Sequence, residues 1–236
     1  MAQTLNRTAE APRHVALIAD GNRRWAKGHH VPVVEGFREG ARRVHDALAW
    51  CDELGAEIVT IFLLSERNLQ RPSDELLPLL DVIRELVVSL QENSDWNTRA
   101  IGEIDTLPTE LANVLIPASG PLPGEARKVV NLAIAYNGHK EIIRAVGNAL
   151  RESSNPTYSA AEIGAEEVSR HLSSTEAPPP DLIIRTSGER RLSGFLLWQA
   201  SDTHLHFRET LWPDFQRSDL LAAFAEYQSQ NRTLGL

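Results

Sequence analysis

The feature of this chain that most constrains its fold is an alternation of short apolar runs with amphipathic stretches. The runs His14–Asp20, Glu57–Leu64, Val129–Tyr136 and Asp181–Thr186 are nearly continuous in apolar, often β-branched residues, which is typical of strands buried on both faces. Stretches with helical spacing separate them. Strands that alternate with helices predict βαβ units, a mostly parallel sheet flanked by helices, and right-handed crossovers.

Two long helices stand out in the pattern. The segment Gly36–Leu54 carries apolar residues at near-helical spacing and is followed by Gly55, a residue suited to cap its C-terminus. Ser73 is predicted to cap a second helix, which runs to about Glu92 and has a broad apolar face. The weaker predictions are a strand near Arg99–Glu103, a short helix after Pro108, helices over His139–Leu150, Ala160–Leu172 and Ser218–Gln228, and a strand near Thr203–Phe207.

The length and composition indicate an ordinary globular protein. The chain has 236 residues, of which 42% are hydrophobic and 24% charged, so we expect a loose tail over 1–12 and a single domain over 13–236. The lone cysteine, Cys51, forms no internal disulfide. No apolar run approaches the ~20 residues of a membrane span, and the polar first twelve residues do not resemble a signal peptide. We therefore expect a cytoplasmic protein with no transmembrane segment.

The charge argues against one class of partner. The net charge is −8, whereas nucleic-acid-binding domains are normally basic, so no nucleic acid is expected as a partner. The cationic residues are 21 arginines against three lysines, a bias that genomic base composition explains overall. Because arginine binds phosphate oxygens in a bidentate fork, the places where arginines gather are still informative.

Polar loops follow four of the predicted strands. They are Asp20–Trp25, Ser65–Pro72, Asn137–Lys140 and Arg185–Arg191, and at least three of them contain arginine. Parallel sheets bind ligands at the carboxyl ends of their strands, so these loops are expected to share one edge. Several anion-binding loops on one edge indicate a ligand with more than one phosphate group.

Two of these loops allow more specific readings. Asp20 beside a glycine and two arginines makes sense if Mg²⁺ lies between the carboxylate and a phosphate; alternatively the loop is a solvated turn in which Asp20 caps the next helix. Arg185 and Arg191 lie on either side of a turn, where both could bind the same anion; alternatively, they form surface ion pairs with Glu189 or Asp181.

Other catalytic and metal motifs are absent or weak. The chain has no G-x-G-x-x-G after a strand, no Walker P-loop and no G-x-S-x-G elbow. His204 and His206 point to the same face of a predicted strand, which allows a metal role, whereas the adjacent pair His29 and His30 is poorly placed to share one ion.

The motifs together are similar to those of a known family. The runs HVALIADGNRRWAK, SERNLQRP, DLIIRTSGERRLSGFLLWQ and ETLWPDF resemble the cis-prenyltransferases, the undecaprenyl diphosphate synthase-like enzymes, from about Arg13 to Arg232. The resemblance implies a central parallel sheet with an apolar tunnel, a homodimer, and transfer of a prenyl group from an allylic diphosphate to a second isoprenoid diphosphate with Mg²⁺.

The resemblance also assigns roles to individual residues. Asp20 matches the catalytic, Mg²⁺-associated aspartate, and Asn68 an asparagine tied to proton removal. Glu75 and the helix around Leu76–Leu90 match the surroundings of the tunnel. The residues matched to the donor site are Gly21, Asn22, Arg23, Arg24, Trp25, Ser65 and Arg71, and those matched to the acceptor site are Arg185, Arg191 and Ser193.

Several positions depart from the family pattern. The glutamate that completes the family's Mg²⁺ site falls on His204, so His204 joins Asp20 as the implied metal pair, although an imidazole suits Mg²⁺ poorly. The other departures are Arg23 for glycine, Val33 for arginine, Phe37 for histidine, Leu69 for tryptophan and His139 for arginine.

These departures indicate a specialised enzyme, and we expect one of secondary metabolism. We expect a C5–C15 allylic donor and a C5 acceptor, isopentenyl or dimethylallyl diphosphate, with pyrophosphate released and a short-chain or irregular, lavandulyl-type product. Two alternatives remain open: a terpene synthase that ionises one prenyl diphosphate without an acceptor, and a non-catalytic subunit of a heteromeric cis-prenyltransferase.

Overall fold

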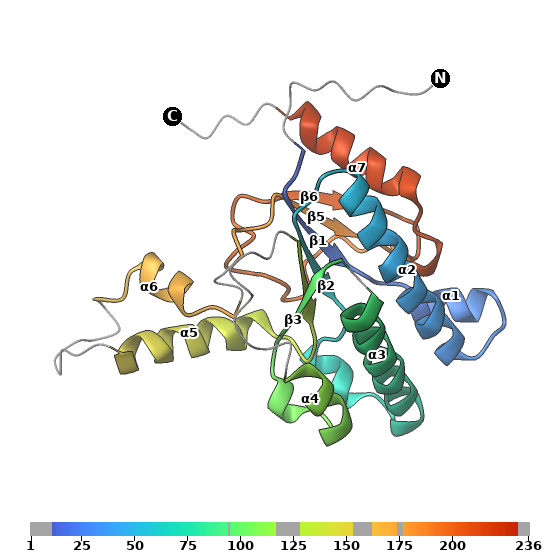
Figure 1. The fold of residues 1–236 in the computed structure, drawn as a ribbon, viewed down its shortest axis with the longest axis horizontal. Helices are drawn as coiled ribbons and strands as arrows, with labels where there is room; N and C mark the ends of the chain where they lie inside the picture. Colours follow the sequence, from blue (N-terminus) through green and yellow to red (C-terminus); the bar gives the residue numbers. More distant parts are fainter. Residues whose placement is uncertain (1–10, 94, 117–127, 153–161, 174–176, 231–236) are drawn as a thin grey trace.

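A six-stranded, wholly parallel sheet forms the centre of the molecule (Figure 1). The computed structural model describes residues 11–93, 95–116, 128–152, 162–173 and 177–230. The strand order is β3-β4-β2-β1-β5-β6. The strands are β1 (His14–Ile18), β2 (Ile58–Phe62), β3 (Asn97–Ile101), β4 (Val129–Ala133), β5 (Leu182–Arg185) and β6 (His204–Phe207). The predicted parallel α/β architecture is confirmed.

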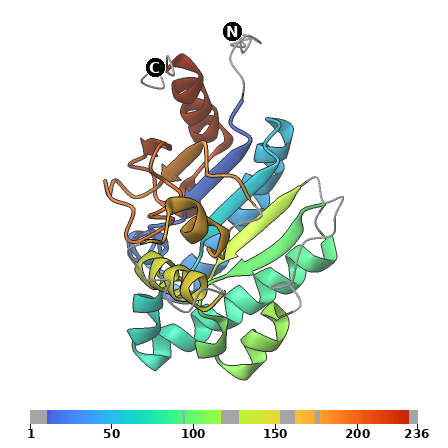
Figure 2. The ribbon, with the colours of Figure 1, turned by 90° about the vertical axis from the view of Figure 1, so that its left-hand side faces the viewer.

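Helices cover both faces of this sheet. The helices are α1 (Asn22–Gly28), α2 (Val33–Glu53), α3 (Ser73–Asn93), α4 (Thr109–Leu115), α5 (Gly138–Glu152), α6 (Ala165–Arg170) and α7 (Arg217–Ser229). Helices α2 and α3 pack against each other on one side, and α5 with α6 lies on the other, in front of the sheet in Figure 2.

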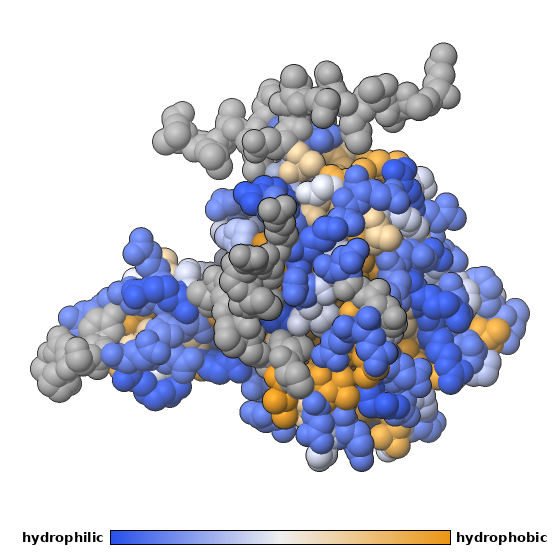
Figure 3. Space-filling model, in the orientation of Figure 1, coloured by the Kyte–Doolittle hydropathy of each residue, from blue (hydrophilic) through white to orange (hydrophobic). Residues whose placement is uncertain are grey.

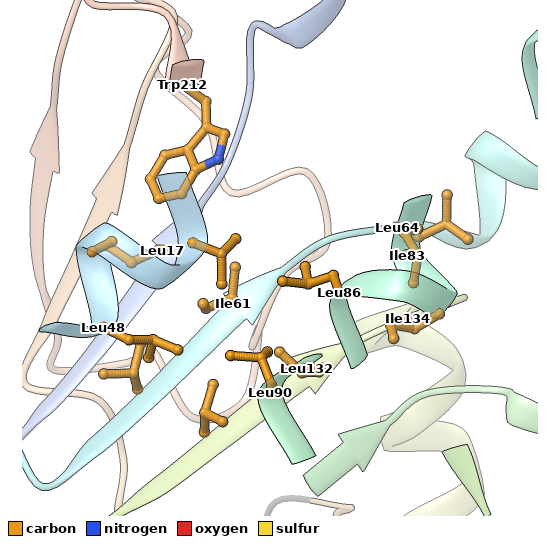
Figure 4. Close-up of a cluster of buried hydrophobic side chains, with 14 of the residues drawn as sticks. Leu17, Leu48, Ile61, Leu64, Ile83, Leu86, Leu90, Leu132, Ile134 and Trp212 are labelled. Carbon is orange, nitrogen blue, oxygen red and sulfur yellow. The ribbon is translucent and has the colours of Figure 1, made fainter. Parts of the chain in front are cut away.

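The core follows from the two-residue period of the strands. Val15 and Leu17 of β1 face α2 and α3 in one large buried cluster, whereas Ala16 and Ile18 belong to a second cluster on the opposite face. Figure 4 shows leucines of α3 facing Ile61 of the sheet. Because both faces of the central strands are covered, these strands have no polar side, which explains the continuous apolar runs in the sequence.

Most predicted elements are present, and their ends show where local signals failed. Gly55 adopts a φ of +84° just after α2, and the N–H groups of Gly55 and Ala56 bond back to the last turn, as a glycine cap requires. The prediction that Ser73 caps α3 is wrong, because the Pro72 carbonyl already accepts the first helical hydrogen bond. Helix α6 is shorter than predicted, and the first residues assigned to it lie outside the described ranges.

The surface seen in Figure 3 is mostly hydrophilic, and its apolar residues gather near α4 and the lower part of α3. The most exposed large apolar side chains of the described residues are Leu77 on α3, Ile116 just after α4, and Ile143 on α5. Among the described residues, no helix is both long enough and apolar enough to cross a membrane.

Helix α1 was not predicted, and glycines in α2 let it pack closely against α2. A Cβ at Gly36 would collide with the backbone oxygen of Asn22, the first residue of α1. Gly40, one turn later, faces the Asn22 side chain in the same way. Small residues on α2 thus let α1 dock beside the end of β1, which places Asn22 at that edge of the sheet.

Gly36→Ala is expected to lower the free energy of unfolding by about 1–3 kcal/mol, because the added methyl group overpacks the contact between α1 and α2. Gly28→Ala is the matched control, since no atom lies within 4 Å of the methyl group it would add. Chemical denaturation of both variants measures the difference. Equal stabilities of the two variants would contradict this account of the packing.

Candidate active site

A cavity of about 320 Å³ opens at the carboxyl ends of β1, β2 and β5. The sequence analysis placed the polar loops at this same edge of the sheet. Strand β1 lies between β2 and β5, so the loops after these three strands are neighbours there. Ten of the predicted site residues line the cavity: Asp20, Gly21, Asn22, Arg23, Arg24, Ser65, Asn68, Arg71, Arg185 and Ser193.

Asp20 is held in place by its backbone. Its N–H donates to the Ile18 carbonyl at 2.9 Å and to the Thr186 hydroxyl oxygen at 3.0 Å, and the same hydroxyl donates to the Asp20 carbonyl at 2.7 Å. Gly21 follows with a φ of +123°, and Leu211 lies 3.0 Å from the point where a Cβ would stand. Only glycine fits this turn, which directs the Asp20 carboxylate into the cavity.

Arg185 supplies a buried positive charge beside that carboxylate. Its side chain is 4% exposed, and one guanidinium nitrogen donates to Asp20 Oδ2 at 2.8 Å. The other donates to the Arg191 carbonyl at 2.5 Å and to Ser193 Oγ at 2.8 Å. The last residue of β5 is thereby fixed between the end of β1 and the loop that follows β5.

Three more arginines surround the mouth of the cavity. Arg24 donates to the Ser187 carbonyl at 3.0 Å, and its guanidinium lies 3.7 Å from the Asp20 carboxylate. Arg23 on α1 and Arg71 before α3 share one partner, Glu75, at 3.1 and 3.2 Å. Burial lowers the pKa of Arg71 from its ordinary value, and Glu75 opposes that shift. Arginine still remains charged at neutral pH, so the mouth is strongly cationic.

Asn68 and Ser65 brace each other at the end of β2. The Ser65 N–H donates to Asn68 Oδ1 at 3.0 Å, and the Asn68 N–H donates to Ser65 Oγ at 3.3 Å. This reciprocal capping starts a short 3₁₀ turn over Glu66–Gln70, which the sequence analysis missed although the S-x-x-N spacing carries its signal. The turn holds both side chains at the cavity wall.

The inner part of the cavity is apolar. Phe37 of α2, Phe62 and Leu63 at the end of β2, and Leu79 of α3 line it. A smaller cavity of about 30 Å³ continues between α2 and α3, and Phe37, Leu63 and Leu79 line both. Of these residues, sequence analysis assigned only the helix that contains Leu79 to an apolar wall. Phe62 and Leu63 were missed because they read simply as core, and Phe37 was noted only as a departure from a family motif.

Three predicted residues lie outside the cavity lining: Trp25, Arg191 and His204. Trp25 turns its indole N–H to Asp214 Oδ1 at 2.8 Å. The Arg191 side chain is exposed and pairs with Glu189, so only its backbone carbonyl reaches Arg185. This ion pair is the alternative that the sequence analysis left open for Arg191.

His204 is not part of this site within the chain. It begins β6 and pairs in register with Leu182, the first residue of β5, whereas Arg185, the last, reaches Asp20. His204 therefore lies toward the amino end of the strands and contacts Glu226 instead. The expectation that His204 and Asp20 share a metal ion is not met within one chain, because strand register separates them.

The loop after β4 contacts the turn after β2 through Glu66. Lys140 and Asn137 both donate to the Glu66 carboxylate. The hydrogen bond from Lys140, followed by that from Asn137, lowers the pKa of Glu66. The only lysine of the four loops is therefore paired already, which leaves the anion-binding role to the arginines.

Arg185 keeps one donor for a ligand. Within the described ranges, its Nε is buried and has no hydrogen-bond partner, and Arg185 lines the cavity. Buried polar groups are normally paired, so this N–H is suited to an anion. The Asp20 carboxylate is a hard oxygen donor, which fits Mg²⁺ held by one carboxylate plus substrate phosphates.

The fold and the cavity define an α/β protein that receives an anionic group beside an apolar one. Residues 18–235 match the model of the Prenyltransf family, the undecaprenyl diphosphate synthase family. The chain belongs to this family and is a prenyltransferase, as the resemblance implied.

The relatives cover nearly all of the chain. "Isoprenyl transferase 2" of Streptomyces coelicolor is 43% identical over 95% of this chain and 90% of its own length. "Short-chain Z-isoprenyl diphosphate synthase" of Mycobacterium leprae is 40% identical, covering 95% and 88%. "(2Z,6E)-farnesyl diphosphate synthase" of Mycobacterium tuberculosis is 39% identical, covering 96% and 89%.

A solved structure supports the same fold. The crystal structure of lavandulyl diphosphate synthase from Lavandula x intermedia, in complex with dimethylallyl diphosphate, superposes with a TM-score of 0.87. It is 32% identical in sequence, and the match covers 96% of this chain and 99% of that one.

Thr186→Val is expected to reduce turnover by about tenfold or more, because small displacements of catalytic groups are costly and the Thr186 hydroxyl positions Asp20. The lost hydrogen bonds should lower stability by about 1 kcal/mol. Thr203→Val is the control, since its hydroxyl also donates to a backbone carbonyl, that of Pro180, away from the cavity. Steady-state kinetics that decline equally in both variants would argue against a positioning role.

Proposed function

We propose that this protein transfers the prenyl group of a C5–C15 allylic diphosphate to a C5 isoprenoid diphosphate, forms a short-chain prenyl diphosphate and releases pyrophosphate. The observation that carries the proposal is the cavity itself, in which an arginine-rich mouth opens onto a short apolar end closed by Phe37, Leu63 and Leu79. The curated relatives named as short-chain synthases support the same assignment.

In this reaction the C–O bond of the donor breaks to leave an allylic cation and a diphosphate anion. Arg23, Arg24 and Arg71 at the cavity mouth would face that anion before the bond breaks, and fixed charges so placed stabilise the leaving group. The apolar wall of Phe37 and Leu79 would exclude water, which otherwise would trap the cation.

The acceptor would lie on the β5 side. We propose that Arg185, Ser193 and, after its ion pair with Glu189 opens, Arg191 hold the acceptor diphosphate. The acceptor double bond then attacks the cation at the donor's C1, and loss of a proton from the new cation restores a double bond. Asn68, braced by Ser65, is placed to direct that proton toward the diphosphate or water.

Mg²⁺ is the proposed cofactor, with Asp20 as its protein carboxylate. When bound, the ion would neutralise charge that develops on the leaving diphosphate. The Asp20 carboxylate already lies beside Arg185 and Arg24, so it would balance the cations of the empty site and anchor the ion in the loaded one.

The assembly proposed from the family resemblance is a homodimer in which residues 13–236 form one catalytic domain. Light scattering of the purified protein tests this state. Every residue invoked in the mechanism above belongs to one chain, so the proposed mechanism does not depend on the dimer.

Product analysis tests the proposed reaction. The purified chain is incubated with Mg²⁺, isopentenyl diphosphate and a C5, C10 or C15 allylic diphosphate, and the products are identified by mass spectrometry and NMR. A C10–C20 diphosphate that is one C5 unit longer than its donor is expected. A linear C50–C55 product, pyrophosphate release without an acceptor, or inactivity of the chain alone would each overturn the proposal; the last two outcomes would favour a terpene synthase or a partner subunit.

A second candidate is head-to-middle coupling of two dimethylallyl diphosphates to a lavandulyl-type product. The close superposition on a lavandulyl diphosphate synthase favours it. Incubation with dimethylallyl diphosphate alone distinguishes the two reactions, because regular coupling also requires isopentenyl diphosphate. A branched C10 diphosphate from this incubation would establish the irregular reaction.

Asp20→Asn is expected to lower turnover by about 100-fold or more while the chain still folds, because the variant removes the carboxylate that faces metal and leaving group. Asp46→Asn, on the exposed side of α2 and paired with Arg43 of the same helix, is the control and should retain activity. Pyrophosphate release measures both. Turnover near that of the wild type in Asp20→Asn would refute the assigned role.

Leu79→Ala is expected to lengthen the product by one or more C5 units, because it would join the main cavity to the smaller one between α2 and α3. Leu77→Ala is the matched control on the same helix, since Leu77 is 57% exposed. Chromatography of the dephosphorylated products reports the distribution. An unchanged distribution in Leu79→Ala, or the same shift in Leu77→Ala, would show that this wall does not limit length.

A further inference from the structure

Two histidines and a glutamate meet between the edge strand β6 and the last helix α7. His204 and His206 are two residues apart on β6 and therefore share a face of the strand. His204 Nε2 lies 3.3 Å from Glu226 Oε1, and His206 Nδ1 lies 2.6 Å from Glu226 Oε2. One ligand atom from each residue falls within 4.8 Å of the other two.

The cluster is half enclosed. The His206 side chain is 8% exposed and that of His204 is 11% exposed, whereas Glu226 is 48% exposed and gives access from solvent. In the described part of the chain, His204 Nε2 and His206 Nε2 are buried without a hydrogen-bond partner. Buried imidazole nitrogens are normally paired, and His204 Nε2 faces Glu226 without a hydrogen bond to it, so this nitrogen is available to a metal ion.

We propose that His204, His206 and Glu226 bind a divalent transition-metal ion of the Zn²⁺ kind. Two imidazoles and one carboxylate are ligands that Zn²⁺ accepts in tetrahedral sites, with bonds of about 2.0–2.1 Å, which places neighbouring ligand atoms about 3.3 Å apart. The separation of His204 from Glu226 already matches this spacing, and the His206–Glu226 hydrogen bond opens slightly as the metal replaces its proton. The fourth position is left for water.

The ligand types distinguish this ion from Mg²⁺, which prefers oxygen donors. Register also separates the cluster from the candidate active site, because His204 pairs with the first residue of β5 and Arg185 is the last. The inference therefore does not depend on the proposed function. The ion would tie α7 to β6, an edge strand at the end of the sheet (Figure 1).

Metal titration of the full chain tests the proposal. Metal-free protein is titrated with Zn²⁺ in competition with a chromophoric chelator, and with Co²⁺ while its visible absorption is recorded. One equivalent of Zn²⁺ and the intense absorption of tetrahedral Co²⁺ are expected. Because even partners outside the coordination sphere commonly contribute tenfold to metal affinity, Glu226→Gln and His206→Gln should each weaken Zn²⁺ binding by at least about tenfold.

The controls separate this site from other histidines. The double variant His29→Asn/His30→Asn removes an exposed pair elsewhere and should bind Zn²⁺ as the wild type does; Asn also tolerates the positive φ of His30. Glu226→Gln covers the case in which His206→Gln fails to fold, since Glu226 is largely exposed. Saturating Zn²⁺ should raise the melting temperature of the wild type and of the double variant but not of Glu226→Gln.

Several outcomes would overturn the proposal: no stoichiometric Zn²⁺ binding by the wild type, equal affinity in Glu226→Gln, or loss of binding only in the double variant. Weak binding of several equivalents by every variant would show adventitious metal on surface histidines and would also reject the site.

Discussion

The buried charge of Arg185 is the constraint on which the functional edge of this protein depends. A guanidinium that is 4% exposed requires a partner, and removing the partner of a buried charge costs about 3–5 kcal/mol. Asp20 provides that partner, and Ser193 and the Arg191 carbonyl complete the set. Satisfying one charge therefore joins the end of β1, the end of β5 and the following loop, and this arrangement positions the Asp20 carboxylate in the cavity.

A few contacts also explain how the site combines a cationic mouth with an apolar wall. Glu75 holds Arg23 and Arg71 together although their charges repel, so the cationic mouth is stable before any ligand arrives. Directly behind it, Phe37 and Leu79 extend the hydrophobic core into the cavity wall. A diphosphate ester with an apolar tail would match both parts, and in the proposed reaction the depth of the apolar part would limit the length of the product.

The two ends of the sheet differ in chemistry. Arginines and oxygen donors gather at the carboxyl ends of the strands, whereas the amino-end side of β6 presents imidazoles against Glu226. Hard oxygen donors favour Mg²⁺ and imidazole nitrogens favour ions such as Zn²⁺. Under the proposal of a zinc-type site, His204 would bind a different ion from the one that the family resemblance assigned to it.

The alternation of apolar runs and amphipathic stretches sufficed to predict a parallel sheet, and the position of the loops after strands sufficed to bring Asp20, Asn68, Arg71 and Arg185 to one edge. Both inferences rest on short-range periodicity and on the rule that parallel strands end together. Tertiary structure alone decided the rest. Helix α1 packs against α2 because Gly36 leaves room for it, and strand register moves His204 away from Asp20. These outcomes depend on contacts between residues far apart in the chain, which no local pattern of residues encodes.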